Sequence, residues 1–171
     1  MSRFRNVLSR HAFLGLALAV SAAATPAEAS SRYFGNVKGT WTGSGEIVAG
    51  KYRGTRFSCR LKGTSPSGSR MKIAGSCRIG LFSQKVAATL RKRGRGYRGT
   101  FLDGAKGNGM DITSGRLDRN RLTVAINRKE LNGAMVANLV NRSTLRISIS
   151  VWAGEDYVPV IGLELKRQRK G

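Results

Sequence analysis

Two alternating segments around the chain's two cysteines constrain the fold more than any other feature of the sequence. Residues 57–79 contain Cys59 and Cys77, and apolar side chains recur at every second position on both sides of a turn-forming run at 64–69. Such alternation is typical of β-strands, whose side chains point to opposite faces in turn. An antiparallel hairpin with Cys59 opposite Cys77 also places Leu61 opposite Gly75 and aligns the two apolar faces, whereas a one-residue slip separates them. We therefore predict a hairpin closed by a Cys59–Cys77 disulfide.

The first 29 residues have the organisation of a secretory signal peptide. Three arginines precede an apolar run at residues 12–20, and Ala27-Glu28-Ala29 supplies a small-x-small cleavage motif. We therefore predict Sec-type export, cleavage after Ala29, a mature chain from Ser30 and a periplasmic or secreted location. The alternative is an uncleaved anchor, but the apolar run is shorter than the roughly 20 residues that a spanning helix needs. We expect no transmembrane span in the mature chain.

Export determines how the cysteines and the scarcity of histidine are interpreted. In an oxidising compartment, two cysteines are most simply one disulfide. The only histidine, His11, lies in the predicted signal peptide. A mature chain without histidine excludes histidine general-base catalysis, Ser-His-Asp triads and histidine-bound metals. We expect no metal site and no cofactor.

The mature chain is strongly basic. Removing residues 1–29 leaves 142 of the 171 residues and takes away three basic side chains and one acidic side chain, so the net charge changes from +22 to +20. Such a charge favours anionic partners, such as lipid or an envelope polymer, and steers them to the surface. A solvated, solubilising surface is the alternative. Nucleic acid is disfavoured as a partner because the chain is predicted to be exported.

The remaining chain has the pattern of antiparallel strands joined by short turns. Residues 30–38 form a short polar lead-in, residues 39–167 a single domain, and residues 168–171 a basic tail. Eight or nine segments of the domain alternate apolar and polar residues, without the intervening helices of a parallel sheet. This pattern predicts a mainly all-β fold, either an up-and-down barrel or a strongly curved sheet.

One late segment has a different spacing. Leu131, Met135 and Leu139 recur at every fourth position, which predicts one short helix over residues 128–140. The alternative is another strand pair that turns at Asn132-Gly133.

A second hairpin is predicted before this segment. Its apolar faces agree if Leu90 lies opposite Tyr97, with the turn at residues 92–95. Further along the chain, the alternation breaks at Gly115, which predicts a β-bulge there.

Several residues predicted to point into a barrel are small or flexible. Met71, Gly75, Ala88 and Gly99 belong to this set. They could leave room for one small ligand, or they could fit the taper of a fully packed barrel.

The start of the first strand resembles a known signature. Gly39-Thr40-Trp41 is similar to the Gly-x-Trp motif of lipocalins and their calycin relatives. The resemblance implies a barrel over residues 39–167 in which Trp41 closes one end, beneath a basic residue of the last strand, here Arg167 or Lys166. The chain also resembles small exported proteins of Gram-negative bacteria without an assigned activity. In fold, it is similar to the small periplasmic inhibitors of secreted metalloproteases.

Two carboxylates flank a glycine-rich loop. Asp103 and Asp111 are the best-placed pair for glycosidase-type chemistry, which needs two carboxylates across a cleft. Structural roles account for them better, Asp103 as a turn residue and Asp111 on the polar face of a strand. The loop also lacks the Gly-Lys-Ser/Thr ending of a phosphate-binding loop. We therefore predict no catalytic residues and a protein that is not an enzyme.

Five basic side chains crowd the tip of the second hairpin, around a tyrosine that could stack on a ligand. Their mutual repulsion favours a bound anion such as a phosphate group, and a solvated turn is the alternative. A second basic strip lies on or near the outward face of the cysteine hairpin. The anion-binding candidates are Arg91, Lys92, Arg93, Arg95, Arg98 and Tyr97, and the secondary strip comprises Arg53, Arg56, Arg60 and Lys62.

These observations favour a non-enzymatic exported β-barrel that binds an anionic or amphipathic envelope component through its basic surface. The component would be a lipid or a lipopolysaccharide phosphate. One alternative is a periplasmic inhibitor or another protein-interaction module. A third hypothesis is a hydrolase that uses carboxylates alone.

Overall fold

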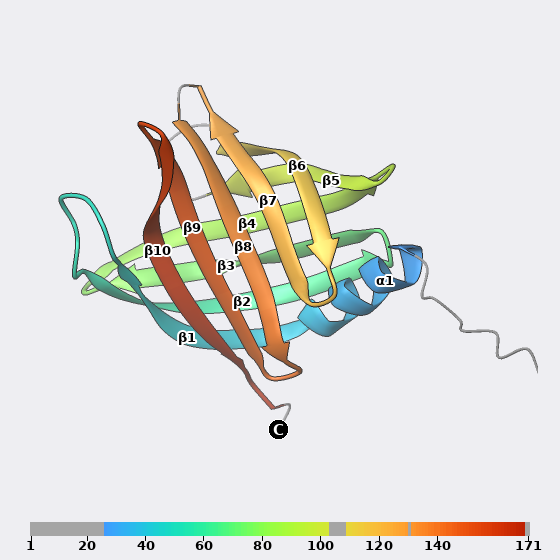
Figure 1. The fold of residues 1–171 in the computed structure, drawn as a ribbon. Helices are drawn as coiled ribbons and strands as arrows, with labels where there is room; N and C mark the ends of the chain where they lie inside the picture. The colour runs from blue at the N-terminus through green and yellow to red at the C-terminus, as the bar shows by residue number, and fades with distance from the viewer. Residues whose placement is uncertain (1–25, 103–108, 130, 170–171) are drawn as a thin grey trace, which may run out of the picture.

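The computed structural model of the protein describes residues 26–102, 109–129 and 131–169. In these residues, one helix packs against a closed barrel of ten antiparallel strands that follow one another in chain order (Figure 1). The elements are α1 (Pro26–Val37), β1 (Gly39–Ile47), β2 (Arg56–Ser67), β3 (Arg70–Ile79), β4 (Phe82–Arg93), β5 (Gly96–Leu102), β6 (Met110–Asp118), β7 (Arg121–Arg128), β8 (Leu131–Asn141), β9 (Thr144–Ala153) and β10 (Asp156–Arg167).

The predicted class, an all-β up-and-down barrel with one short helix, is confirmed. The described residues form ten strands, however, and not eight or nine. β1 and β10 close the barrel through residue pairs that run from Trp41–Arg167 to Ile47–Ile161. Closure removes the free sheet edges of a long meander. Ten strands also enclose a wider interior than the eight that side chains can fill.

The helix predicted over residues 128–140 is wrong, because this segment is the end of β7 and most of β8. Leu131, Met135 and Leu139 are four residues apart, and a spacing of four is also a multiple of the strand period of two. Gly133 and Met135 accordingly point into the barrel together with Leu139. The alternative turn at residues 132–133 is also wrong, because residues 131–133 already pair with β7.

The helix of the fold lies at residues 26–37, where a polar lead-in had been expected from residue 30. Pro26 occupies its first turn together with Glu28, and both residue types favour a helix start. Tyr33, Phe34 and Val37 form one apolar face and are fully buried. The predicted cleavage point after Ala29 therefore falls inside α1.

The cysteine hairpin has the predicted register. Cys59 pairs with Cys77 and Leu61 with Gly75 across β2 and β3. The two cysteines form a disulfide. The β4–β5 hairpin has a tight two-residue turn, and not the wider turn expected at residues 92–95. Its register differs accordingly, and Leu90 faces Gly99 and not Tyr97.

Gly75 and Gly99 serve close strand packing and not cavity volume. A Cβ atom added at Gly75 would lie 2.0 Å from the backbone oxygen of Arg60, and one added at Gly99 would lie 1.8 Å from that of Thr89. The missing side chains let neighbouring strands approach and bend sharply, as a closed barrel requires. The bulge expected at Gly115 lies slightly earlier, between Ile112 and Ser114.

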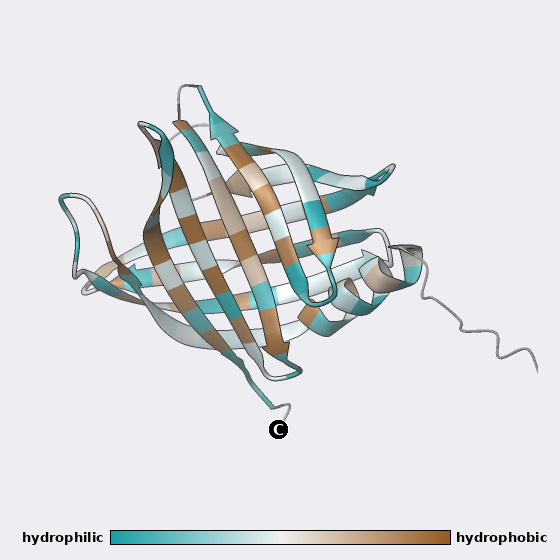
Figure 2. Ribbon diagram, viewed as in Figure 1, coloured by the Kyte–Doolittle hydropathy of each residue, from teal (hydrophilic) through white to brown (hydrophobic). Residues whose placement is uncertain are grey.

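Hydrophobic and hydrophilic residues alternate along the strands, most clearly along β7 to β10 (Figure 2). Their inward side chains form one apolar core that continues into the apolar face of α1. The last hairpin shows the pattern clearly, with Leu145 opposite Leu165 and Ile147 opposite Leu163. Among the described residues, no helix is both long and apolar enough to cross a bilayer.

Candidate ligand cavity and basic surface

One end of the barrel is closed by α1. The hydroxyl group of Tyr33 donates a 2.8 Å hydrogen bond to the backbone oxygen of Ala137 on β8. The Ser30 and Tyr97 hydroxyl oxygens lie 2.5 Å apart and are both buried. The rings of Phe34 and Tyr97 also meet edge to face. These contacts hold the helix as a plug between strands on both sides of the barrel.

The same end contains the Trp41 arrangement that the lipocalin resemblance implied. Trp41 is fully buried, and its indole nitrogen donates a 2.8 Å hydrogen bond to the backbone oxygen of Val37. The guanidinium carbon of Arg167 lies 4.3 Å from the centroid of the indole ring. Arg167, and not Lys166, is thus the basic residue of the last strand that covers the tryptophan. Lys166 instead bonds to Thr144 and Glu164 on the outer face.

Inside the barrel, beyond this plug, lies a cavity of about 740 Å³. Its volume falls within the range of about 300–1,000 Å³ that is usual for small-molecule sites. Strands from all around the barrel contribute aliphatic and aromatic side chains to its wall. They include Phe57, Leu61, Met71, Ile73, Val86, Ala88, Phe101, Met135, Ile149 and Leu163. Of the inward residues named from the sequence, Met71 and Ala88 belong to this wall, whereas Gly75 and Gly99 do not.

The cavity wall is almost entirely apolar. Among the described residues that form it, none carries a charge, and the polar ones are Tyr33, Tyr52, Thr55 and Gln84. The hydroxyl group of Tyr33 already donates a hydrogen bond to a backbone oxygen. Burial, and to a smaller extent electrostatic interaction with Tyr97, raises the pKa of the Tyr33 phenol, so this side chain stays neutral. A charged group inside the cavity would lose its hydration without gaining a partner. The cavity therefore suits an apolar chain or ring.

The cavity opens at the end opposite α1. Tyr52, Ile79 and Gln84 belong to its wall and are exposed to solvent. They come from the connection between β1 and β2 and from the strand ends at the β3–β4 turn. A ligand would enter between these residues, because α1 occupies the other end.

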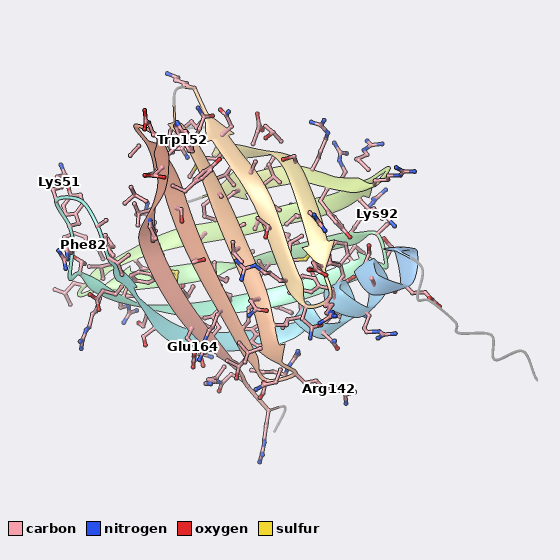
Figure 3. All side chains as sticks on the ribbon, in the orientation of Figure 1. Lys51, Phe82, Lys92, Arg142, Trp152 and Glu164 are labelled. Atoms are coloured by element: carbon pink, nitrogen blue, oxygen red, sulfur yellow. A yellow bond between two sulfur atoms is a disulfide. The ribbon has the colours of Figure 1, made fainter. Side chains whose placement is uncertain are left out.

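The predicted basic cluster lies on β4 and β5, toward the closed end (Figure 3). Arg91, Arg93, Arg95 and Arg98 are exposed, and Lys92 is half-buried. Tyr97 is not available to stack on a ligand as expected, because it is only 4% exposed and its hydroxyl group contacts Ser30. It serves to hold the plug helix.

Three arginines of this region form a row across neighbouring strands. Arg70 on β3 pairs in register with Arg91 on β4, which pairs with Arg98 on β5. Like charges directly opposite each other in a sheet repel. Among the described residues, no ion pair involves any of the three.

The secondary strip is distributed along the barrel and does not form one cluster. Arg53 lies in the connection before β2, and Arg56 begins β2 and forms a 3.7 Å ion pair with Glu46. Arg60 and Lys62 follow on the outward face of β2, nearer the closed end. The strip thus runs from the open end of the barrel toward the closed end.

Of the two carboxylates named for glycosidase-type chemistry, the structure describes only one. Asp111 is exposed on the outer face of β6, and Asp103 lies outside the described residues. Glu164, on the outer face of β10, accepts hydrogen bonds from Lys166 and Arg146, and these bonds hold its pKa below the ordinary value.

Solved structures that resemble this fold include the following two. The crystal structure of Rv2717c from M. tuberculosis has a TM-score of 0.59 and 13% sequence identity, and the match covers 82% of this chain and 98% of that one. A protein with unknown function from the DUF3598 family of Nostoc punctiforme PCC 73102 has a TM-score of 0.48 and 14% identity, over 79% of this chain and 49% of that one. No protein-family model and no curated protein matches the chain. The first likeness supports the closed antiparallel barrel and nothing about function.

Proposed function

We propose that this protein is a non-enzymatic binding protein for an amphipathic envelope lipid or a related amphiphile, whose apolar part occupies the barrel interior. The observation that carries the proposal is the uncharged, largely aliphatic cavity of about 740 Å³ with one open end. Burial of apolar surface is the main driving force for binding in such a site. Among the described residues, the wall contains no carboxylate, histidine, lysine or free thiol, which favours binding over catalysis.

The position of a polar headgroup follows from the charges around the opening. The described residues of the cavity wall offer no charged partner, so a charged head would remain at the mouth. Lys51, Arg78 and Lys85 lie at or beside the strand ends of this mouth and are exposed. Their field favours an anionic head over a cationic one.

The lipocalin-like relationship and the envelope location belong to the same proposal. Trp41 beneath Arg167, together with an up-and-down barrel around an apolar cavity, supports a calycin-type protein. The disulfide between Cys59 and Cys77 and the leader-like first residues support an exported, periplasmic protein.

A second candidate function is the binding of an anionic polymer on the outer face. The row formed by Arg70, Arg91 and Arg98 favours it, since a bound anion would relieve the repulsion between them. Binding of a sulfated polysaccharide that weakens with salt and is lost in Arg91→Ser/Arg98→Ser would support this second function.

The cavity is tested by filling it. Protein that begins at Pro26 retains every described helix and strand, and its binding of N-phenylnaphthylamine can be followed by fluorescence, with palmitate as a competitor. Ala88 is buried and belongs to the cavity wall, so Ala88→Phe should weaken probe binding about tenfold by occupying the site. Ala74→Phe is the matched control, because Ala74 lies on the outer face of the neighbouring strand. Unchanged binding by folded Ala88→Phe protein would refute the interior site.

A further inference from the structure

The exposed apolar side chains are concentrated at the open end of the barrel. Of the eleven large hydrophobic residues that are exposed in the described part of the chain, ten lie at strand ends or connections of this end, and Val140 lies near the other. Tyr52, Leu81 and Phe82 are the most exposed, at 60%, 99% and 82%. Exposed apolar patches of this kind mark interaction surfaces in soluble proteins.

The β3–β4 turn is the most apolar part of this rim. Gly80 adopts a positive φ of 55° in the two-residue turn that joins Ile79 to Phe82. The turn projects Leu81 and Phe82 into solvent, while Ile79 contributes to the cavity wall. The tip therefore connects the outer rim directly to the apolar interior.

Basic side chains surround this tip. Arg78 precedes the turn and Lys85 follows it, and both are exposed. In the adjoining connection between β1 and β2, Arg53 is exposed, and the Lys51 ammonium nitrogen lies 4.8 Å from the centroid of the Tyr52 ring. Among the described acidic residues of this end, Glu46 lies beside this connection in an ion pair with Arg56, and the others lie at the β9–β10 turn and the start of β6.

Two further aromatic residues complete the rim on the opposite side. Trp152 and Tyr157 pair across β9 and β10 with ring centroids 4.9 Å apart, and both are about half exposed. Figure 3 places Trp152 and Phe82 on separate parts of the barrel end away from α1. Tryptophan and tyrosine favour the headgroup region of bilayers.

We infer that the open end of the barrel is a membrane-docking surface, which inserts the tip at residues 79–82 into an anionic lipid bilayer. Apolar side chains enter the acyl region while the surrounding lysines and arginines contact anionic headgroups. A bilayer accounts for both properties together, whereas a purely apolar protein partner would leave the basic side chains unused. The docking surface stands without the proposed ligand function, but it would bring the mouth of the cavity to a source of amphiphiles.

Vesicle binding tests the docking surface directly. Protein from Pro26 onward is mixed with phosphatidylglycerol–phosphatidylcholine vesicles and with pure phosphatidylcholine vesicles, and co-sedimentation is measured across a salt series. We expect binding to the anionic vesicles that weakens with salt. Leu81→Ser/Phe82→Ser should weaken it about tenfold or more, because two large apolar side chains no longer enter the bilayer. Val140→Ser is the matched control, since it removes an exposed apolar side chain at the other end.

Tryptophan fluorescence then locates the contact. The chain has two tryptophans, and Trp41 is fully buried whereas Trp152 lies at the rim. Brominated lipids should therefore quench Trp152 on docking, and Trp152→Phe should remove the quenching. Absence of binding to anionic vesicles would overturn the inference. Vesicle binding that survives Leu81→Ser/Phe82→Ser but is lost in Arg91→Ser/Arg93→Ser/Arg95→Ser would also overturn it, because the contact would then lie on β4 and β5. So would an oligomer in solution that Leu81→Ser/Phe82→Ser dissociates, because the tip would then bind another copy of the chain. Loss of docking alone would leave probe binding in the cavity intact.

Discussion

The guanidinium group of Arg167 lies over the indole ring of Trp41, 4.3 Å from its centroid, across the seam where the last strand pairs with the first. The same guanidinium donates hydrogen bonds to the backbone oxygens of Asn36 and Lys38, just where α1 ends. Its Nε atom donates a 2.7 Å bond to the backbone oxygen of Arg142. One side chain therefore joins the plug helix, the closing seam and the β8–β9 turn.

Replacing this arginine should destabilise the closed barrel even when the charge is kept. Lysine cannot reproduce several hydrogen bonds in fixed directions, and its ammonium group covers the ring less well. We expect Arg167→Lys to lower the free energy of unfolding by about 2 kcal/mol, measured by urea denaturation. Arg169→Lys, at an exposed position after β10, is the control and should have no effect. Equal stability of the two variants would contradict the role of Arg167.

Tyr33 should make stability fall at alkaline pH. Burial raises its pKa above the ordinary value, so the folded state keeps the phenol proton while the unfolded state loses it above about pH 10. Unfolding then releases a proton, and the free energy of unfolding decreases as pH rises. In Tyr33→Phe this contribution is absent, so the stability advantage of the wild type should narrow above pH 10. A difference in free energy of unfolding between wild type and Tyr33→Phe that is constant with pH would count against this assignment. So would the same pH-dependent narrowing for Tyr52→Phe, which changes an exposed tyrosine.

The strands could be predicted from the sequence because their signals are local. Alternating apolar residues on both sides of Cys59 and Cys77 fix one register, and the structure has that register. β8 was misassigned because the spacing of its apolar residues satisfies both a helix and a strand. Only the pairing of Met135 with Val124 and Ile149 on its two neighbours distinguishes them.

The candidate site was less predictable because it depends on contacts between distant segments. Ala88 was known to be small, but whether a cavity remains depends on side chains from all ten strands. Tyr97 sits among arginines in the sequence, yet its hydroxyl group meets Ser30, 67 residues away. Pro26 and Glu28 were a helix-start signal that the cleavage motif obscured. The apolar turn at Leu81 and Phe82 could have been recognised from the sequence by its hydropathy.

The disulfide should contribute stability without being required for the fold. Cys59 and Cys77 are 18 residues apart in the chain, and closing such a loop contributes about 3 kcal/mol in the chain-entropy model. We expect dithiothreitol to lower the melting temperature, while circular dichroism retains the β-sheet spectrum, because both strands keep a second neighbour. Cys59→Ser/Cys77→Ser should melt at the lower temperature with or without dithiothreitol. A melting temperature insensitive to reduction would contradict the proposed contribution.

The residue at which the chain begins should affect thermal stability, because it determines how much of α1 is present. A chain that begins at Ser30 loses the first turn of α1, including Glu28, and places an ammonium group at a helix start, where positive charge is unfavourable. We expect it to melt at a lower temperature than a chain that begins at Pro26. Intact mass spectrometry of the exported protein separately tests the cleavage predicted after Ala29. Equal melting temperatures of the two chains would contradict the contribution of the first helical turn.

The most direct test of the central claim is the affinity of straight-chain fatty acids of increasing length, measured by calorimetry on the purified protein. If the chain lies in the aliphatic cavity, the binding free energy should become more favourable by about 0.8 kcal/mol for each added methylene until the cavity is full. Ala88→Phe should reach its limit at a shorter chain, and Ala74→Phe should follow the wild type. No binding at any length, or an affinity that depends on salt but not on chain length, would contradict a ligand site inside the barrel.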